Sequence, residues 1–205
     1  FQHEKQWKYS WDAAPATKRT EVPLSPEPTG VFHEKGAIPF SWTDERRYAP
    51  ESEVTVFTWD IDKTYLATRT ETASDLVRTF LEFAIDKEVV GGTVPLLKGI
   101  RRGGEGGRWG APIYFVSASP VQMRSVLQRK MLLDGVQQDG IALKDQLGLL
   151  FRYGPHVFRR QMAYKLTALL HYRLRRPPQI PEILFGDNSE SDPLVYGLYR
   201  RIVEG

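Results

Sequence analysis

Short apolar runs alternate with longer segments of helical periodicity from residue 54 to the end of the chain. Residues 54–59 combine β-branched and aromatic side chains, and residues 113–116 and 182–185 form two similar runs. Runs of this length and composition are typical of buried strands. Apolar residues at helical spacing predict helices at 74–85, from Pro95, from Pro120, at 164–172 and at 194–203. Strands that alternate with helices predict an α/β fold in which a doubly wound parallel sheet is covered on both faces.

The first 53 residues follow a different pattern. They are rich in proline and aromatic residues and show little periodicity, as the segment 23–28, Pro-Leu-Ser-Pro-Glu-Pro, illustrates. Such a composition suits an extended arm and not an independent core. We therefore predict a loop-rich N-terminal extension over residues 1–53 that packs on the core, and a main domain over residues 54–205.

Length and composition place the chain among single-domain globular proteins. With 205 residues, of which 41% are hydrophobic and 26% charged, it can bury one sizeable core. No apolar run has the length of a membrane span, and the lack of cysteine excludes disulfides and thiolate metal sites. We predict a cytoplasmic protein that is either free or peripheral to a membrane. Because the chain begins at Phe1 and not at Met, a targeting segment upstream remains an alternative.

A mild excess of positive charge is gathered in arginine clusters. The net charge is +3, and the sequence pI is about 9.1. Clusters such as Arg101-Arg102 and Arg175-Arg176 can attract anionic substrates or an anionic membrane surface, although charge runs are more often solvated helix faces. Aromatic residues that stack on bases are not interleaved with these arginines, which argues against nucleic acid as a partner. The sequence does not predict an oligomeric state.

Acidic and hydroxyl side chains follow the three predicted strands at the point where each strand ends. Asp60 and Asp62 follow the first strand, Ser117 the second, and Asp187 with Asp192 the third. In parallel sheets the ligand crevice lies beyond the carboxyl ends of the strands, so we expect these side chains to meet there. Carboxylates at such an edge can bind a hard cation such as Mg²⁺ together with the phosphate that it neutralises.

The spacing of Asp60 and Asp62 suits acid–base chemistry. On an extended chain, residues two apart point to the same side. One carboxylate can attack phosphorus while the other protonates the leaving group and then activates the hydrolytic water. The alternative is an aspartate pair that only stabilises a turn.

A cation and a hydroxyl complete the candidate site. For the cation, which offsets the charge of the carboxylates and of a phosphate, we select Lys165. It leads an amphipathic helix, whereas we predict a loop position for its rival, Lys144. Ser117 and the backbone at the predicted helix start form a candidate anion site. The alternative is that Ser117 only caps that helix, which is the role that we expect for Ser119.

These residues occur in motifs that resemble those of the haloacid dehalogenase (HAD) superfamily. The segment 59–64, Trp-Asp-Ile-Asp-Lys-Thr, resembles its first motif, D-x-D-x-T after a hydrophobic strand, and the segment 115–120, Phe-Val-Ser-Ala-Ser-Pro, resembles its second. Lys165 fits the lysine of the third motif, and residues 186–192 fit the fourth. Within the superfamily, the phosphatidate phosphatase App1-like branch is the most similar, on the matching positions Ser117, Ser119, Pro120, Asp192, Pro193 and Tyr196. Lys63 departs from that branch, which usually has Asp there.

The resemblance implies a role for each candidate residue. Asp60 would be the nucleophile and Asp62 the general acid and base. Mg²⁺ would be held by the Asp60 carboxylate, the Asp62 carbonyl oxygen and Asp187, with Asp192 acting through water or orienting these ligands. The implied phosphate contacts are Ser117, Ala118 and Lys165, and the implied neighbours of the metal ligands are Thr64, Asn188 and Ser189. For Asn188 and Ser189 the alternative is that they cap the following turn.

The resemblance also implies a HAD-like Rossmannoid catalytic domain over residues 54–205 with a minimal cap or none, because the insertion 65–111 has no room for a large lid. Residues 1–53 or another subunit are candidates to cover the open crevice. We predict a Mg²⁺-dependent phosphomonoester hydrolase that acts through an aspartyl-phosphate, with a phospholipid such as phosphatidate as one candidate among phosphorylated substrates. Two alternatives stay open: a phosphotransferase with the same chemistry, and a non-catalytic module that binds anionic lipid.

Overall fold

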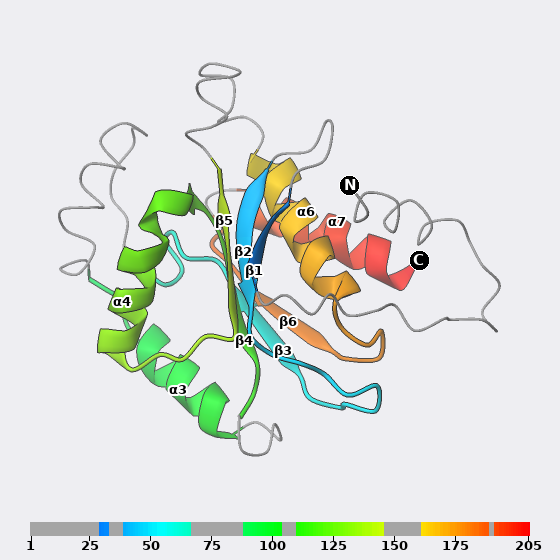
Figure 1. Cartoon of the computed structure of the whole chain (residues 1–205), viewed down its shortest axis with the longest axis horizontal. Coiled ribbons are helices and arrows are strands. Elements are labelled where there is room, and N and C mark those ends of the chain that lie inside the picture. The colour runs from blue at the N-terminus through cyan, green and yellow to red at the C-terminus, as the bar shows by residue number, and fades with distance from the viewer. Residues whose placement is uncertain (1–28, 33–38, 67–87, 104–109, 146–160, 189–190) are drawn as a thin grey trace.

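The computed structural model describes residues 29–32, 39–66, 88–103, 110–145, 161–188 and 191–205 (Figure 1). In this part of the chain, a six-stranded sheet packs with four α-helices. The strands are β1 (Thr29–Phe32), β2 (Phe40–Asp44), β3 (Val56–Trp59), β4 (Ile113–Pro120), β5 (Gly140–Lys144) and β6 (Glu182–Phe185). The helices are α3 (Thr93–Gly103), α4 (Arg124–Asp134), α6 (Gln161–Leu174) and α7 (Asp192–Glu204), and a 3-10 turn, Val121–Met123, precedes α4. The fold is of the α/β class, as the sequence predicts.

The sheet has a parallel centre and an antiparallel margin. Its order is β1-β2-β5-β4-β3-β6. β4 and β6 flank β3 in parallel and β5 is parallel to β4, whereas β2 is antiparallel to β5 and β1 to β2. The chain thus runs outward from β3 to β4 and β5 and then returns to the other side of β3 for β6. Ligand crevices of open α/β sheets lie beyond the carboxyl ends of the strands at such a reversal of strand order.

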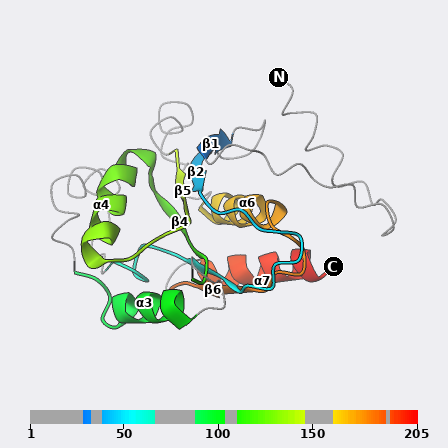
Figure 2. The ribbon, with the colours of Figure 1, turned by 60° about the horizontal axis from the view of Figure 1, so that its bottom comes forward.

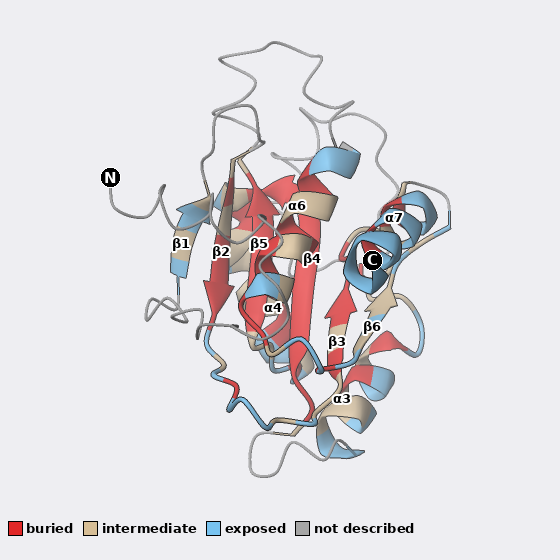
Figure 3. Cartoon of the chain, turned by 90° about the vertical axis from the view of Figure 1, so that its right-hand side faces the viewer, coloured by how far each residue is buried: buried red, intermediate tan, exposed pale blue. Residues whose placement is uncertain are grey.

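Helices lie on both faces of the sheet. α3 and α4 lie on one side, and α6 and α7 on the other (Figures 1 and 2). Along β4, Tyr114 and Val116 face the hydrophobic cluster under α6 and α7, while Ile113 and Phe115 face the cluster under α3 and α4. β4 is therefore buried on both faces, and Figure 3 shows the same for most of the central sheet. This explains why β4 reads as a continuous apolar run and not as an alternating one.

Most of the elements predicted from residue 54 onward are present. β3, β4 and β6 lie at the three predicted strands, and α3, α6 and α7 at three of the predicted helices, with most ends shifted by a few residues. The helix predicted over 74–85 lies outside the described residues.

The helix predicted from Pro120 begins later than expected. β4 continues to Pro120 through a shift of register, which pairs Ser117 with Leu143 and then Pro120 with Lys144. Pro120 has an extended backbone, with φ −62° and ψ 147°, and α4 begins only at Arg124, after the 3-10 turn. Proline fixes φ but leaves ψ open, so the same residue suits a helix start and a strand end. The prediction of a helix N-terminus at Ser119 and Pro120 was therefore wrong.

The sequence did not predict β1, β2 or β5. β2 shows a short alternation in which Phe40 and Trp42 enter the core beneath α6, a signal masked by the proline-rich surroundings. β5 begins at Gly140, where a Cβ atom would lie 2.5 Å from a carbonyl oxygen of β2. It ends at Lys144, which is buried in the strand and not in a loop as predicted. The division at residue 53 stays a prediction, although β1 and β2 belong to the same sheet as the later strands.

Candidate active site

Asp60 lies directly after β3, the strand at which the sheet order reverses. Its backbone N–H donates a hydrogen bond to the Phe185 oxygen of β6 at 2.9 Å. The ring of Trp59 stacks on that of Phe185 with centroids 4.0 Å apart. These contacts hold the ends of β3 and β6 side by side and bury the Asp60 carboxylate, which is 1% exposed.

Lys165 and Asp192 form a buried ion cluster with Asp60. The Lys165 Nζ lies 2.9 Å from Asp60 Oδ1 and 2.5 Å from Asp192 Oδ1. Lys165 points to this cluster because its helix packs on the sheet through the neighbouring positions Tyr164 and Ala168, both fully buried. The two residues selected in the sequence as nucleophile and cation are thus in direct contact.

Asp192 approaches Asp60 where the backbone of Gly186, directly after β6, packs closely against the first turns of α7. A Cβ atom at Gly186 would lie 2.3 Å from Asp192 Oδ2 and 2.8 Å from Tyr196 Oη. Tyr196 donates a hydrogen bond to the last carbonyl of β6 at 3.0 Å, which holds α7 against that strand. Carboxylate oxygens of Asp60, Asp187 and Asp192 consequently lie within 4.8 Å of one another. Glycine at position 186 is a requirement of this close approach.

Asp62 is oriented by two serine hydroxyls at the end of β4. Its Oδ2 accepts hydrogen bonds from Ser117 Oγ at 3.1 Å and from Ser119 Oγ at 3.0 Å. The Ser119 N–H donates in turn to Ser117 Oγ at 2.9 Å. The sequence assigned Ser119 to a helix cap, which is wrong because β4 continues past it. The V-S-x-S-P pattern was the available signal, since residues two apart on a strand share one face.

The turn that carries Asp62 has an unusual backbone. The Ile61 oxygen accepts hydrogen bonds from the N–H groups of both Tyr65 and Leu66 at 2.9 Å. Lys63 has φ +61° and is the one non-glycine residue with positive φ among those described. Its side chain is exposed, as the alternation of the sequence predicts. Strained backbone of this kind is concentrated at functional sites.

The remaining candidates lie around this cluster or outside it. Ala118 is half-buried between the two serines on β4. Thr64 is tied to the start of α3, because its carbonyl oxygen accepts a hydrogen bond from Thr93 Oγ1 at 3.2 Å. Asn188 is exposed in the turn after β6, and Ser189 lies outside the described residues. We call Asp60, Asp62, Lys165, Asp187 and Asp192 the carboxyl-edge cluster.

Burial dominates the electrostatics of the carboxyl-edge cluster. It raises the pKa of Asp60 well above its usual range; Lys165 opposes this shift, while Asp62 and Asp192 add to it. Burial by itself lowers the pKa of Lys165, but the charges of Asp60 and Asp192 raise it above its ordinary value. Lys165 is therefore charged at neutral pH, and the carboxylates around it repel one another.

The donor set of this cluster fits a hard divalent cation. Asp60 Oδ2 is buried and has no hydrogen-bond partner among the described residues. It lies with the oxygens of Asp187 and Asp192 in an arrangement that could hold a metal ion. Carboxylate oxygens are the ligands that Mg²⁺ prefers, and a bound cation would relieve the repulsion between them.

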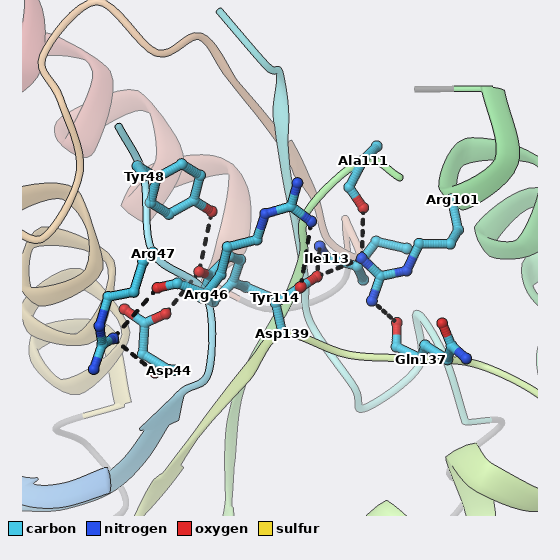
Figure 4. A network of polar contacts seen from close by, with 10 residues as sticks. All are labelled: Asp44, Arg46, Arg47, Tyr48, Arg101, Ala111, Ile113, Tyr114, Gln137 and Asp139. Carbon is cyan, nitrogen blue, oxygen red and sulfur yellow. Dashed lines mark hydrogen bonds and ion pairs between the residues drawn. The ribbon is translucent and has the colours of Figure 1, made fainter. Parts of the chain in front are cut away.

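A second polar cluster lies at the opposite edge, near the amino ends of β4 and β5 (Figure 4). Arg101 Nη1 lies 2.6 Å from Asp139 Oδ2, which also accepts the Ile113 N–H at 2.8 Å. Asp44 Oδ1 accepts a hydrogen bond from Tyr114 Oη at 2.8 Å, and its Oδ2 lies 3.1 Å from the Nε of Arg175. We call this set the amino-edge cluster, which comprises Asp44, Arg46, Arg101, Tyr114, Asp139 and Arg175.

A cavity of about 230 Å³ also lies near the amino ends of the strands, between the last turns of α3 and α4. It is lined by Leu97, Lys98, Arg101, Arg102, Gly135, Val136 and Gln137. Cations near helix C-termini interact favourably with the helix dipole, which accounts for its basic lining. The cavity is separate from the carboxyl-edge cluster.

Comparison with known families identifies the family of the chain. The family described as phosphatidate phosphatase APP1, catalytic domain, matches residues 56–204. The match spans most of the chain and includes the whole carboxyl-edge cluster, so the chain belongs to this family. Membership indicates a phosphatase that acts on phosphoric monoesters, and it supports the App1-like part of the resemblance. The assignment to the HAD superfamily stays a prediction.

Neither the curated proteins nor the solved structures include a match to this chain. None of the helices in the described ranges combines the length and hydropathy that a bilayer-spanning segment needs.

Proposed function

We propose that this chain hydrolyses phosphatidate to diacylglycerol and inorganic phosphate, with Mg²⁺ as cofactor and Asp60 as nucleophile. The observation that carries the proposal is the convergence of the Asp60, Asp187 and Asp192 carboxylates at one edge of the sheet, around the ammonium of Lys165. The family match supports a phosphorylated lipid as the substrate.

The metal would be held by the carboxylates of Asp60 and Asp187 and by the carbonyl oxygen of Asp62, with Asp192 beside them. Mg²⁺ supplies positive charge that stabilises the phosphoryl group during transfer. Lys165 supplies a second positive charge and fixes the orientation of Asp60. Ser117, Ala118 and Lys165 would contact the phosphate, and Thr64, Asn188 and Ser189 would surround the metal ligands.

The chain's own carboxylates carry out both half-reactions. An oxygen of Asp60 forms a bond to phosphorus while the bond between phosphorus and the diacylglycerol oxygen breaks, and Asp62 donates a proton to that oxygen. Asp62 then takes a proton from water, whose oxygen bonds to phosphorus. The bond from phosphorus to Asp60 breaks, so inorganic phosphate leaves and both carboxyl groups return to their starting states.

The position of Asp62 suits this exchange of a proton. Its carboxylate is half-buried, so water can reach it, whereas Asp60 is fully buried. The hydroxyls of Ser117 and Ser119 both donate to its Oδ2, which fixes the orientation of this carboxylate.

The decisive experiment traps the phosphorylated enzyme. Asp62→Asn removes the group that activates water, so we expect phosphate from phosphatidate to accumulate on Asp60 in the presence of Mg²⁺. Mass spectrometry of the peptide that contains residue 60 detects it. Asp44→Asn, which changes a buried aspartate of the amino-edge cluster, is the matched control and should show no trapped phosphate.

Three outcomes would contradict parts of the proposal. Hydrolysis of phosphatidate without phosphate on Asp60 would replace the covalent route by direct attack of water. Formation of a phosphorylated alcohol when glycerol is added would favour the phosphotransferase alternative. Binding of anionic lipid without release of phosphate, with Mg²⁺ present, would favour the non-catalytic module.

A further inference from the structure

Helix α7 carries apolar side chains on two of its sides. On its inner side, Val195 and Tyr199 are buried in the core with the sheet and α6. On its outer side, Leu194 is 63% exposed, Leu198 44% and Ile202 38%. Residues four apart lie on one face of a helix, so these three side chains form a continuous outer stripe. A surface helix normally presents polar residues on that side.

The surroundings of the outer stripe are open. Pro193 and Gly197 are exposed beside it, and among the described residues no atom outside the adjoining helix backbone lies within 4 Å of the position of a Cβ at Gly197. Figure 3 shows the outer side of α7 as exposed, in contrast to the buried strands at the centre of the sheet. The stripe is therefore accessible to a large flat partner.

Two arginines and one glutamate are exposed near the C-terminal end of the stripe. Arg200 and Arg201 are exposed in the last turns of α7, and Glu204 pairs with Arg200 at 2.7 Å. An apolar helix face with arginines beside it is the pattern of helices that lie in the interface of a bilayer with anionic lipid. The sequence predicts this helix but does not indicate a membrane-binding face on it, because its inner and outer apolar residues together resemble those of an ordinary core helix.

The outer stripe begins at the candidate active site. Asp192 is the first residue of α7 and contacts Lys165 at 2.5 Å, and Leu194 follows two positions later. Leu194 and Asp192 point to opposite sides of α7 but belong to the same helical turn, so a surface that holds Leu194 lies within one turn of the carboxyl-edge cluster. A lipid phosphate needs such proximity, because its acyl chains keep it at the bilayer surface.

We propose that the outer stripe of α7, Leu194, Leu198 and Ile202, docks this chain on the surface of a bilayer that contains anionic lipid. The choice of phosphatidate as the lipid that is turned over rests on the proposed function, but docking itself does not. A second copy of the chain is a less suitable occupant. In a two-fold pairing of α7 with itself, the arginines of both copies would share one interface and repel each other.

The test measures docking without turnover. The full chain is mixed with vesicles of phosphatidylcholine and phosphatidylserine, roughly four to one, in EDTA, and the bound fraction is measured by flotation. The variant Leu194→Gln/Leu198→Gln/Ile202→Gln should bind the vesicles at least about tenfold more weakly than the wild type. The matched control is Leu132→Gln/Leu133→Gln on α4, whose leucines are 75% and 64% exposed, and it should bind like the wild type.

Two further measurements keep the test decisive. Arg201→Gln, which leaves the apolar residues in place, should weaken binding by about fivefold, and less at high salt. With Mg²⁺, the ratio of vesicle phosphatidate hydrolysis to hydrolysis of a soluble aryl phosphate should fall in the stripe variant and stay constant in the control.

The outcomes separate docking from catalysis. Wild-type binding of vesicles by the stripe variant, with folding verified by circular dichroism, would overturn the docking proposal even if phosphatidate is hydrolysed. A change from dimer to monomer in that variant, without any vesicle binding by the wild type, would assign the stripe to a second copy and also overturn it. Vesicle binding that needs the stripe, without hydrolysis of any substrate, would support docking and contradict the proposed function.

Discussion

The two polar clusters of this chain use similar residues but differ in the balance of their charges. In the amino-edge cluster, Asp139 and Asp44 each lie beside an arginine, at 2.6 Å and 3.1 Å, and each also accepts a hydrogen bond from a neutral donor. In the carboxyl-edge cluster, one ammonium, that of Lys165, lies between the carboxylates of Asp60 and Asp192, and a third carboxylate, that of Asp187, is close to both.

We attribute this difference to a structural role for the amino-edge cluster and to the chemical role proposed above for the carboxyl-edge cluster. Buried charges that are matched and hydrogen-bonded hold a fold in one arrangement. In the proposed function, a divalent cation held by these carboxylates would offset the repulsion between them. Strongly polar surroundings alone would not distinguish the two clusters, since both contain buried aspartates with cationic partners.

The comparison is tested most severely at Asp60. Asp60→Asn should lower phosphatidate hydrolysis by about a thousandfold or more, because an amide cannot serve as the nucleophile. In EDTA the variant should be at least as stable as the wild type, because one of several like charges is gone. Phosphate release and urea denaturation measure the two effects. Loss of stability in EDTA would show that the carboxyl-edge charges are balanced after all.

The opposite result is expected at Asp44. Asp44→Asn leaves Arg175 buried beside a neutral group, so the free energy of unfolding should fall by about 3 kcal/mol. The turnover number of the folded fraction should change little, because the amino-edge cluster lies at the other edge of the sheet. Urea denaturation followed by an assay well below the midpoint measures both. A large fall in the turnover number with unchanged stability would contradict this separation and show that the amino-edge cluster also affects catalysis.

The third prediction concerns the pH dependence of stability that the buried His171 causes. This residue is buried among the rings of Phe40 and Trp42, and burial, with the charges of Arg175 and Arg176, lowers its pKa from 6.5 to about 3. The unfolded chain therefore binds a proton that the folded chain does not between these values. Stability should fall as the pH is lowered through this window, by up to about 1.4 kcal/mol per pH unit.

The control for this pH effect is His171→Gln, which cannot take up the proton. The difference in free energy of unfolding between wild type and variant should shrink from pH 7 to pH 4, as measured by urea denaturation at each pH. A difference that is constant over this range would mean that His171 does not titrate with a lowered pKa.

The smallest effect is expected at Lys63, beside the carboxyl-edge cluster. Its φ of +61° disfavours a residue with a side chain, so Lys63→Gly should raise the free energy of unfolding by up to about 1 kcal/mol. Thermal denaturation measures the gain. If hydrolysis of phosphatidate falls at the same time, the exposed lysine contacts the substrate; unchanged hydrolysis would restrict Lys63 to the turn.

The sequence could predict those features that depend on local patterns. The apolar runs that became β3, β4 and β6 are buried on both faces or carry aromatic residues, so their composition identifies them. The sequence could predict that Asp60, Asp187 and Asp192 lie close together, because parallel strands share their carboxyl edge. Lys165 could be chosen over Lys144 because the sequence places it on an amphipathic helix.

Features that depend on pairing between distant segments could not be predicted. β5 becomes a strand because β4 and β2 supply partners on either side, although its own composition, with Gly140 and Lys144 at its ends, is not typical of a strand. The register shift between β4 and β5, through which β4 continues to Pro120, leaves no mark in the sequence. The outer side of α7 is recognisable only when the inner side is known.

β2 has a consequence for anyone who shortens this chain. It pairs along the whole of β5 from Phe40 to Asp44, and Phe40 and Trp42 fill the core beneath α6. The region that matches the family begins at residue 56, after β2. A fragment cut at that point would expose the edge of β5 as an open template on which further chains can pair. We expect such a fragment to aggregate, whereas one that begins before β1 keeps this edge closed.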